Sequence, residues 1–149
     1  MKKELKISAI ENGTVIDHIP ASNAFKAVSI LGLENHDNVV SVANNLKSKV
    51  VGKKCLIKVG GKSLTKDEVN KIAIIAPDAT VNIIKDYDVK EKISVSLPTE
   101  MENVVKCSNP QCITNAEKVR GKFYVLEKKP LKVKCHYCER CFKKDIELI

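Results

Sequence analysis

The sequence contains no tryptophan, and aromatic residues make up only 4% of its 149 residues. Proteins that bind single-stranded nucleic acid usually stack bases on aromatic side chains, so this scarcity counts against that function. No apolar run approaches the length of a membrane span, and the residues after Met1 do not form the apolar core of a signal peptide. We therefore expect a cytoplasmic protein with no membrane partner.

Recognisable catalytic constellations are also missing. The sequence offers no paired carboxylates and no Ser-His-Asp arrangement at a familiar spacing, so we expect no catalytic residues. Its composition is that of a globular protein, with 44% hydrophobic and 30% charged residues and a formal net charge of +8. A mildly basic chain suits an anionic ligand or an acidic protein surface at least as well as it suits nucleic acid.

Four cysteines form the most specific pattern in the chain. Cys107 and Cys112 make one short pair, and Cys135 and Cys138 make a second pair after an insert of 22 residues. Two thiol pairs joined by a hairpin-sized insert can place four sulfurs around one tetrahedral zinc ion, and the alternatives are a redox dithiol or coincidence. Four thiolates leave no open position on the metal, so the predicted site is structural.

Two further cysteines need separate interpretations. Cys141 continues the spacing of Cys135 and Cys138, which gives the second pair two possible registers. We prefer Cys135 with Cys138 and expect Cys141 to be a free thiol or a neighbour of the site. Cys55 lies in a predicted strand and is expected in the core.

Residues 1–97 alternate strand and helix patterns. This order predicts a ferredoxin-like α/β sandwich, with helices on one face of an antiparallel sheet, and therefore an α+β fold. The expected elements are strands over 5–10, 14–19, 38–46, 54–59 and 79–85, a helix over 22–31, and a second helix from a capping box at Thr65–Glu68 to Pro77. The first helix is expected to bury a stripe of Ala24, Phe25, Val28 and Leu31 and to end at Gly32.

Residues 98–149 are too few to bury a self-sufficient core, so the predicted zinc ion would hold them together. Residues 86–100 lose periodicity and are predicted to be a linker. Beyond the first cysteine pair, 118–126 and 131–134 alternate around a turn at 128–130, and 145–148 could add an edge strand. We expect a small zinc-bound antiparallel β domain.

Asp17 and His18 stand together at the end of a predicted strand. A carboxylate and an imidazole at this position are compatible with an ordinary solvated strand end. They could also converge with Lys58 and Lys92 on an anion that carries hydroxyl groups. Composition alone leaves both interpretations open.

Several segments together resemble the regulatory chain of aspartate carbamoyltransferase. The resemblance runs along nearly the whole chain and implies a non-catalytic subunit with a nucleotide-binding allosteric domain over 1–97 and a zinc domain over 98–149 that docks on the catalytic chain. It further implies a regulatory-chain homodimer, a structural Zn²⁺, and the effectors CTP and ATP, with UTP as a further candidate. It rests on Gly13–Pro20 (GTVIDHIP), Leu56–Lys58, Ala76–Asn82, Ser96–Pro98 and the cysteine quartet.

The resemblance also implies the residues of the nucleotide site. Asp17 and Lys58 would contact the ribose, because a carboxylate can accept hydrogen bonds from its hydroxyls. His18, Asn82 and Lys92 would lie near the phosphates. The remaining implied residues are Ala9, Ile10, Tyr87 and Val89 around the base, with Val15 and Ile84 also lining the site. The chain departs from the family pattern at Gln111, at His136 and in the 47–51 loop.

Two other functions compete with this one. A zinc-ribbon protein that binds nucleic acid would agree with the net charge and the cysteine pairs, although Phe123 and Tyr124 would be its only adjacent aromatic residues. A zinc hydrolase or transferase is the least favoured, because four thiolates close the metal to substrate.

Overall fold

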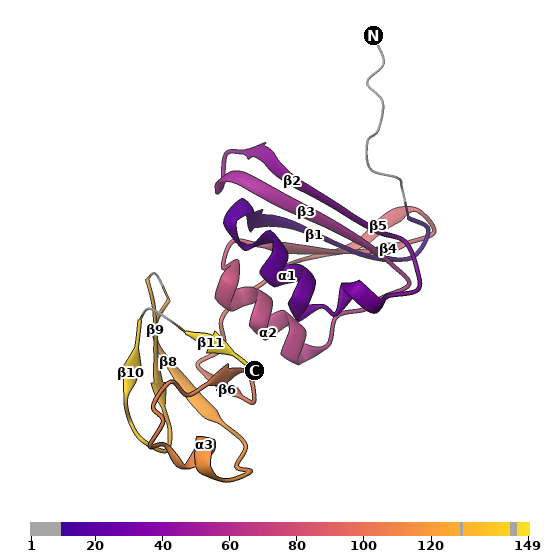
Figure 1. The fold of residues 1–149 in the computed structure, drawn as a ribbon. Helices are drawn as coiled ribbons and strands as arrows, with labels where there is room; N and C mark the ends of the chain where they lie inside the picture. Colours follow the sequence, from indigo (N-terminus) through magenta and orange to yellow (C-terminus); the bar gives the residue numbers. More distant parts are fainter. Residues whose placement is uncertain (1–9, 129, 144–145) are drawn as a thin grey trace. The chain divides into compact units, whose positions relative to one another are not determined.

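The computed structural model describes residues 10–128, 130–143 and 146–149 (Figure 1). The chain divides into two compact units, residues 1–95 and 96–149. The sequence predicted a boundary two residues further on, after residue 97. No helix in the described part of the chain is long and apolar enough to cross a membrane.

Unit 1 contains one antiparallel sheet in the order β2-β3-β1-β4-β5. Helices α1 and α2 cover one face of it (Figure 1), so the predicted ferredoxin-like fold is confirmed. The predicted strand over 5–10 falls almost wholly outside the described residues. The elements are β1 (Gly13–Pro20), η1 (Ala21–Asn23), α1 (Ala24–Ile30), η2 (Leu33–Asn35), β2 (Val40–Ser48), β3 (Gly52–Gly60), α2 (Lys66–Ile75), β4 (Thr80–Lys85) and β5 (Asp88–Ser94).

Strand alternation places the core of unit 1 between the sheet and its helices. Ile16 pairs with Ile57 on β3 and with Val81 on β4. All three are buried, as are Ile72 and Ala73 of α2. Burying such aliphatic side chains contributes roughly 1.5–3 kcal/mol each, which keeps the sheet and helices together. The residues between them on each strand point to the opposite face. No helix among the described residues covers that face, which we call the uncovered face.

The helix signals in the sequence are confirmed at the capping box and at Gly32, but one residue of the predicted buried stripe is exposed. Thr65 accepts a hydrogen bond from the Glu68 backbone at 3.2 Å, and Glu68 accepts one from the Thr65 backbone at 2.9 Å, which completes the capping box. Gly32 follows the end of α1 as expected. The predicted buried stripe on α1 is wrong at Phe25, which is 84% exposed, while Ala27 is fully buried. The buried residues Ala24, Ala27 and Leu31 are spaced i, i+3 and i+7, and Phe25 lies beside this stripe on the exposed side of the helix.

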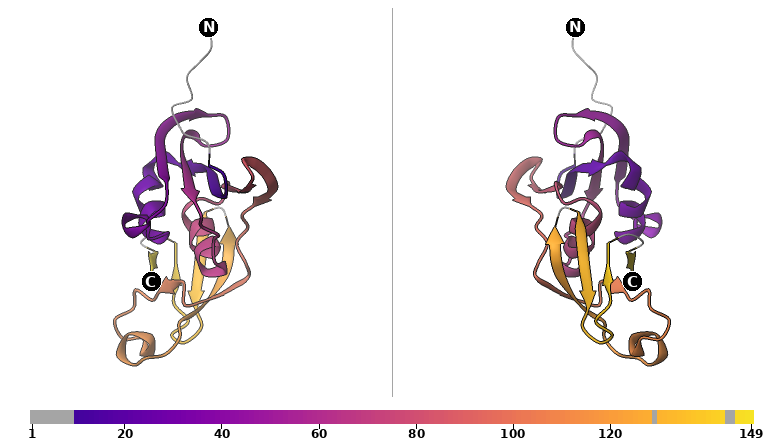
Figure 2. Two further views of the ribbon diagram at one scale, coloured as in Figure 1. Left: turned by 90° about the vertical axis from the view of Figure 1, so that its right-hand side faces the viewer. Right: turned by 90° about the vertical axis from the view of Figure 1, so that its left-hand side faces the viewer.

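The predicted linker over 86–100 is also wrong, because residues 88–94 form the edge strand β5. Asp86 and Tyr87, both with positive φ, make a tight turn that returns the chain beside β4. All seven residues of β5 are exposed. Without a buried face the strand shows no apolar period, so sequence pattern could not reveal it. The β4–β5 hairpin projects from the rest of the sheet (Figure 2).

Unit 2 is built from short antiparallel strands around Phe123, Met101 and Val133, all buried. The predicted strands around residues 118–126, 131–134 and 145–148 are present, shifted by a few residues; residues 129 and 145 lie outside the described part. Strands β6, β7 and β10 and helix α3 have too few residues for a periodic signal. The elements are β6 (Glu100–Glu102), β7 (Val105–Lys106), α3 (Ile113–Ala116), β8 (Lys122–Lys128), β9 (Leu131–Cys135), β10 (Cys141–Phe142) and β11 (Glu147–Leu148).

Candidate functional site

The fold brings the four predicted thiol ligands together in unit 2. The sulfurs of Cys107, Cys112, Cys135 and Cys138 all lie within 4.8 Å of one another. The Cys107 and Cys138 sulfurs are 3.7 Å apart, and those of Cys112 and Cys135 are 3.8 Å apart. Four sulfurs at the usual Zn–S distance of about 2.3 Å are separated by about 3.8 Å, so the cluster has the dimensions of a tetrahedral zinc site.

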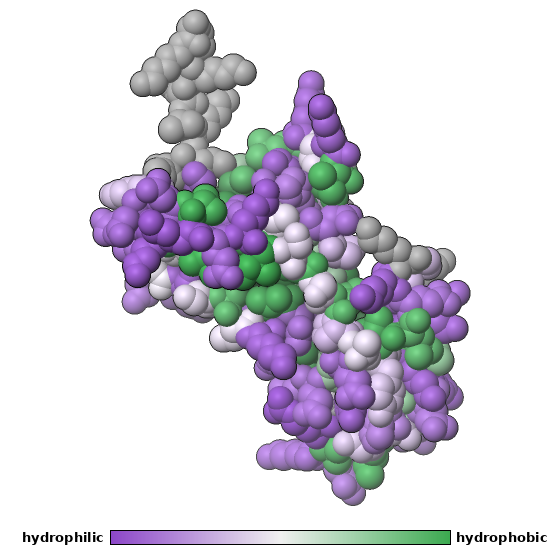
Figure 3. All heavy atoms as spheres, turned by 180° about the vertical axis from the view of Figure 1, so that it is seen from behind, coloured by the Kyte–Doolittle hydropathy of each residue, from purple (hydrophilic) through white to green (hydrophobic). Residues whose placement is uncertain are grey.

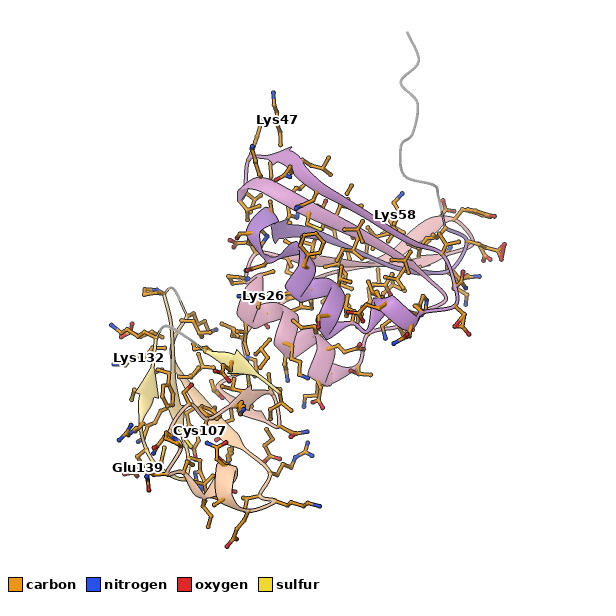
Figure 4. All side chains as sticks on the ribbon, viewed as in Figure 1. Lys26, Lys47, Lys58, Cys107, Lys132 and Glu139 are labelled. Atoms are coloured by element: carbon orange, nitrogen blue, oxygen red, sulfur yellow. The ribbon has the colours of Figure 1, made fainter. Side chains whose placement is uncertain are left out.

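Hydrogen bonds around the first cysteine pair fix the sulfurs in this arrangement. The Asn115 side chain donates to the carbonyl oxygens of Cys107 at 2.9 Å and Asn109 at 2.7 Å. Buried Asn109 accepts from the Gln111 backbone at 3.0 Å, and Thr114 donates to the Cys112 sulfur at 3.1 Å. These bonds hold the chain around Cys107 and Cys112 against the start of α3 and orient both ligands. Cys107 is labelled in Figure 4.

The environments of the thiols show why the cluster needs a cation. Burial raises the pKa of Cys107 to about 12. Burial also opposes ionisation of Cys138, but hydrogen bonds from the Arg140 backbone, the Asn109 side chain and the neighbouring cysteines together outweigh it and lower the pKa of Cys138 to about 7. Four neighbouring thiolates therefore do not form on their own at neutral pH. A divalent metal would displace the remaining protons as it binds.

Cys141 lies outside this cluster and is exposed, whereas Cys55 is buried in the core of unit 1 as predicted. The structure therefore brings Cys135 and Cys138, and not Cys141, together with the first cysteine pair. The resulting site has four sulfur ligands and can shape a surface, but it leaves no position for a substrate.

Four of the predicted nucleotide residues lie in one row on the uncovered face of the unit 1 sheet. Val15 on β1 pairs with Lys58 on β3 and with Asn82 on β4, and Asn82 pairs with Lys92 on β5. Directly paired residues point to the same face. The four side chains therefore form a row across four strands, and Lys58 extends from the sheet away from α1 and α2 (Figure 4).

A β-bulge distorts β1 at Asp17 and His18, toward one end of this row. His18 has φ 63°, an uncommon conformation for a residue other than glycine. The Asp17 carboxylate accepts a hydrogen bond from the His18 backbone N–H at 2.7 Å. The His18 ring Nδ1 lies 3.3 Å from the Thr80 hydroxyl. Lys54 forms an ion pair with Asp17 at 2.9 Å. Bulges next to binding sites commonly re-aim side chains in this way.

The other end of the uncovered face is apolar. Ile10, Val15 and Ile84 form one buried cluster with Leu56 packed against it. Ile10 and Tyr87 also line a cavity of about 410 Å³. Val89 pairs with Ile84 on the same face, and Ala9 lies outside the described residues. The polar and apolar ends of the face are therefore distinct.

Sequence reasoning missed several residues of this face. Lys54 and Thr80 contact Asp17 and His18, and Asn38, Gly60 and Gly61 complete the cavity beside Ile10. No sequence pattern around Lys54 or Thr80 marks either residue as part of a site. Their positions follow only from strand register, which places Lys54 opposite Pro20 and Thr80 opposite Asp17.

Comparisons with known proteins identify the family of this chain. Residues 5–96 match the family model described as "Aspartate carbamoyltransferase regulatory chain, allosteric domain", and residues 99–147 match the one described as its "metal binding domain". Aspartate carbamoyltransferase regulatory chains from Thermococcus sibiricus and Parabacteroides distasonis are 56% and 50% identical over 144 residues. These alignments cover 97% of this chain and 95% and 94% of the respective relatives. The chain belongs to the family of aspartate carbamoyltransferase regulatory chains.

Proposed function

We propose that this chain binds CTP or ATP on the uncovered face of unit 1 and relays the state of that site to the catalytic chain of aspartate carbamoyltransferase. The observation that carries the proposal is the row of Lys58, Val15, Asn82 and Lys92, which ends beside the bulge at His18. Its two lysines, with His18, supply positive charge for a triphosphate, and the apolar cluster beyond the row supplies a surface for a base.

The contacts can be assigned to parts of the nucleotide. Asp17 keeps acceptor capacity beyond its bonds to Lys54 and the His18 backbone, because a carboxylate has about four lone-pair sites. It would accept from the ribose hydroxyls, with Lys58 beside it. Asn82, Lys92 and His18 would bind the phosphates, and Ile10, Ile84, Tyr87 and Val89 would surround the base. Regulation follows if the nucleotide binds one quaternary state of the assembly more tightly than the other.

Unit 2 has a different part in this proposal. Its cysteine cluster fixes the two cysteine-bearing turns, which display exposed Gln111 and His136. The His136 ring accepts or donates a 2.6 Å hydrogen bond with the Tyr124 hydroxyl, which holds it at the surface. We propose that these turns dock on the catalytic chain. Reduced thiols at the metal site are compatible with the cytoplasmic location expected from the sequence.

Lys58→Ala should weaken CTP binding and leave the fold intact. Removing one charge-assisted hydrogen bond costs roughly 1.5–3 kcal/mol, or about 10-fold to 100-fold in affinity. Isothermal titration calorimetry measures this directly, with Lys47→Ala as the control because Lys47 lies at the outer end of the β2–β3 hairpin (Figure 4). Equal CTP affinity in the two variants would remove Lys58 from the site.

The proposed homodimer is supported by the two edges of the sheet. Edge strand β5 carries charges at Asp88, Lys90, Glu91 and Lys92, which oppose pairing with another chain. Edge strand β2 has no charged residue before Lys47 and exposes Val42 by 44%. We propose that two copies of the chain meet along β2.

Val42→Glu should therefore convert the dimer into a monomer. Ile93→Glu is a matched control, because Ile93 is 40% exposed and lies on β5 in the same residue row, which runs through Ile57, Ile16 and Val81. Sedimentation velocity on the two variants distinguishes the edges. A dimeric Val42→Glu chain, or a monomeric Ile93→Glu chain, would contradict pairing along β2.

A further inference from the structure

One side of the 410 Å³ cavity contains residues that the proposed nucleotide contacts do not include. On the uncovered face, Gly13 pairs with Gly60 on β3 and with Ile84 on β4. The Gly60 backbone N–H also donates to the Val39 carbonyl at 2.7 Å. Beyond the apolar cluster the sheet therefore continues with two neighbouring residues that have no side chain.

The Asn38 side chain occupies the space beside Gly60 and Gly61. A Cβ atom added to Gly60 would lie 2.7 Å from Asn38 Oδ1, and one added to Gly61 would lie 2.7 Å from Asn38 Nδ2. Both distances are too short for real atoms, so any side chain at 60 or 61 would force the Asn38 amide to move. Because residues 60 and 61 have no side chains, the Asn38 amide can lie close to their backbone at the edge of the cavity that all three residues line.

The Asn38 amide also has a defined polarity. Its Oδ1 accepts the Val39 backbone N–H at 2.7 Å. Its Nδ2 therefore remains to donate, and the part of the chain that the structure describes shows no acceptor for it. Ring nitrogens of purines and the ring carbonyl of cytosine are acceptors of the kind that such a donor binds.

We infer that Asn38, Gly60 and Gly61 form the far wall of the base pocket and determine the size of base that it admits. The inference rests on the proposed function, because it assumes that the base lies beside Ile10 and Tyr87, which line the same cavity. The space beside Gly60 would accommodate the second ring of a purine. A pyrimidine would reach the Asn38 amide less closely and depend less on this space.

Gly60→Val tests the size of the pocket. The added side chain pushes Asn38 into the cavity, so ATP affinity should fall about tenfold or more while CTP affinity falls less than about threefold, since a misplaced methyl group in a pocket has effects of this order. Inorganic triphosphate, which has no base, should bind the variant and the unchanged chain equally. Calorimetry with the three ligands gives all values, and a thermal melt checks the fold.

Asn38→Ala provides a second measurement that adds no atoms and so does not endanger the fold. It should weaken ATP several-fold and leave inorganic triphosphate unchanged. The inference is overturned if Asn38→Ala binds ATP as the unchanged chain does, or if a folded Gly60→Val keeps the original ratio of ATP to CTP affinity. An unchanged chain that binds neither nucleotide overturns the proposed function itself, and this inference with it.

Discussion

Removal of the metal will unfold unit 2 and separate the chain from its catalytic partner, while CTP still binds unit 1. Structural zinc contributes roughly 10–16 kcal/mol in small peptides. Unit 2 spans only residues 96–149 and is built on short strands, so it has no comparable reserve of buried surface. Unit 1 has its own five-stranded sheet and two helices and shares none of the four ligands.

The measurement combines zinc release, sedimentation with the catalytic chain and CTP titration on one sample treated with a mercurial reagent. Cys138→Ser should reproduce the loss of assembly, since it removes one ligand. Cys141→Ser is the matched control, because Cys141 is exposed and lies outside the cluster. If the metal-free chain still sediments with the catalytic chain, the docking surface of unit 2 forms without zinc.

The second large effect is expected at Gly13, where β1 begins. Gly13 has φ 148°, and a Cβ atom there would collide with the Val59 carbonyl oxygen. Val59 is fully buried and paired in the centre of the sheet, so that carbonyl has no room to retreat. Gly13→Ala should destabilise unit 1 by about 3 kcal/mol or more, through backbone strain and overpacking together.

Gly52→Ala separates these two causes. Gly52 also has a positive φ, 81°, but nothing lies within 4 Å of an added Cβ. Its variant should lose only about 1–2 kcal/mol, the cost of the strained conformation. Urea unfolding followed by far-ultraviolet circular dichroism compares the two proteins. Similar urea midpoints in the two variants would show that the contact between an added Cβ atom and the Val59 carbonyl relaxes without cost, which would contradict the prediction for Gly13.

Sequence patterns predicted the parts of this fold whose residues carry their own signal. The capping box at Thr65 and the spacing of Cys107 to Cys138 are local, and both are found as predicted. Strand β5 and the outward position of Phe25 depend on what covers each surface, which periodicity does not encode. The roles of Lys54 and Thr80 depend on strand register over 37 and 62 residues, so only the folded chain reveals them.

The exposure of β5 has a consequence for motion. A strand with no buried side chain is held mainly by its backbone pairing with β4, so its amide hydrogens should exchange with solvent sooner than those of β1 and β3. Lys92 and Val89 stand on this strand, and Ser96, where unit 2 begins, follows its end by two residues. A ligand that contacts both β5 and the inner strands should therefore slow this exchange.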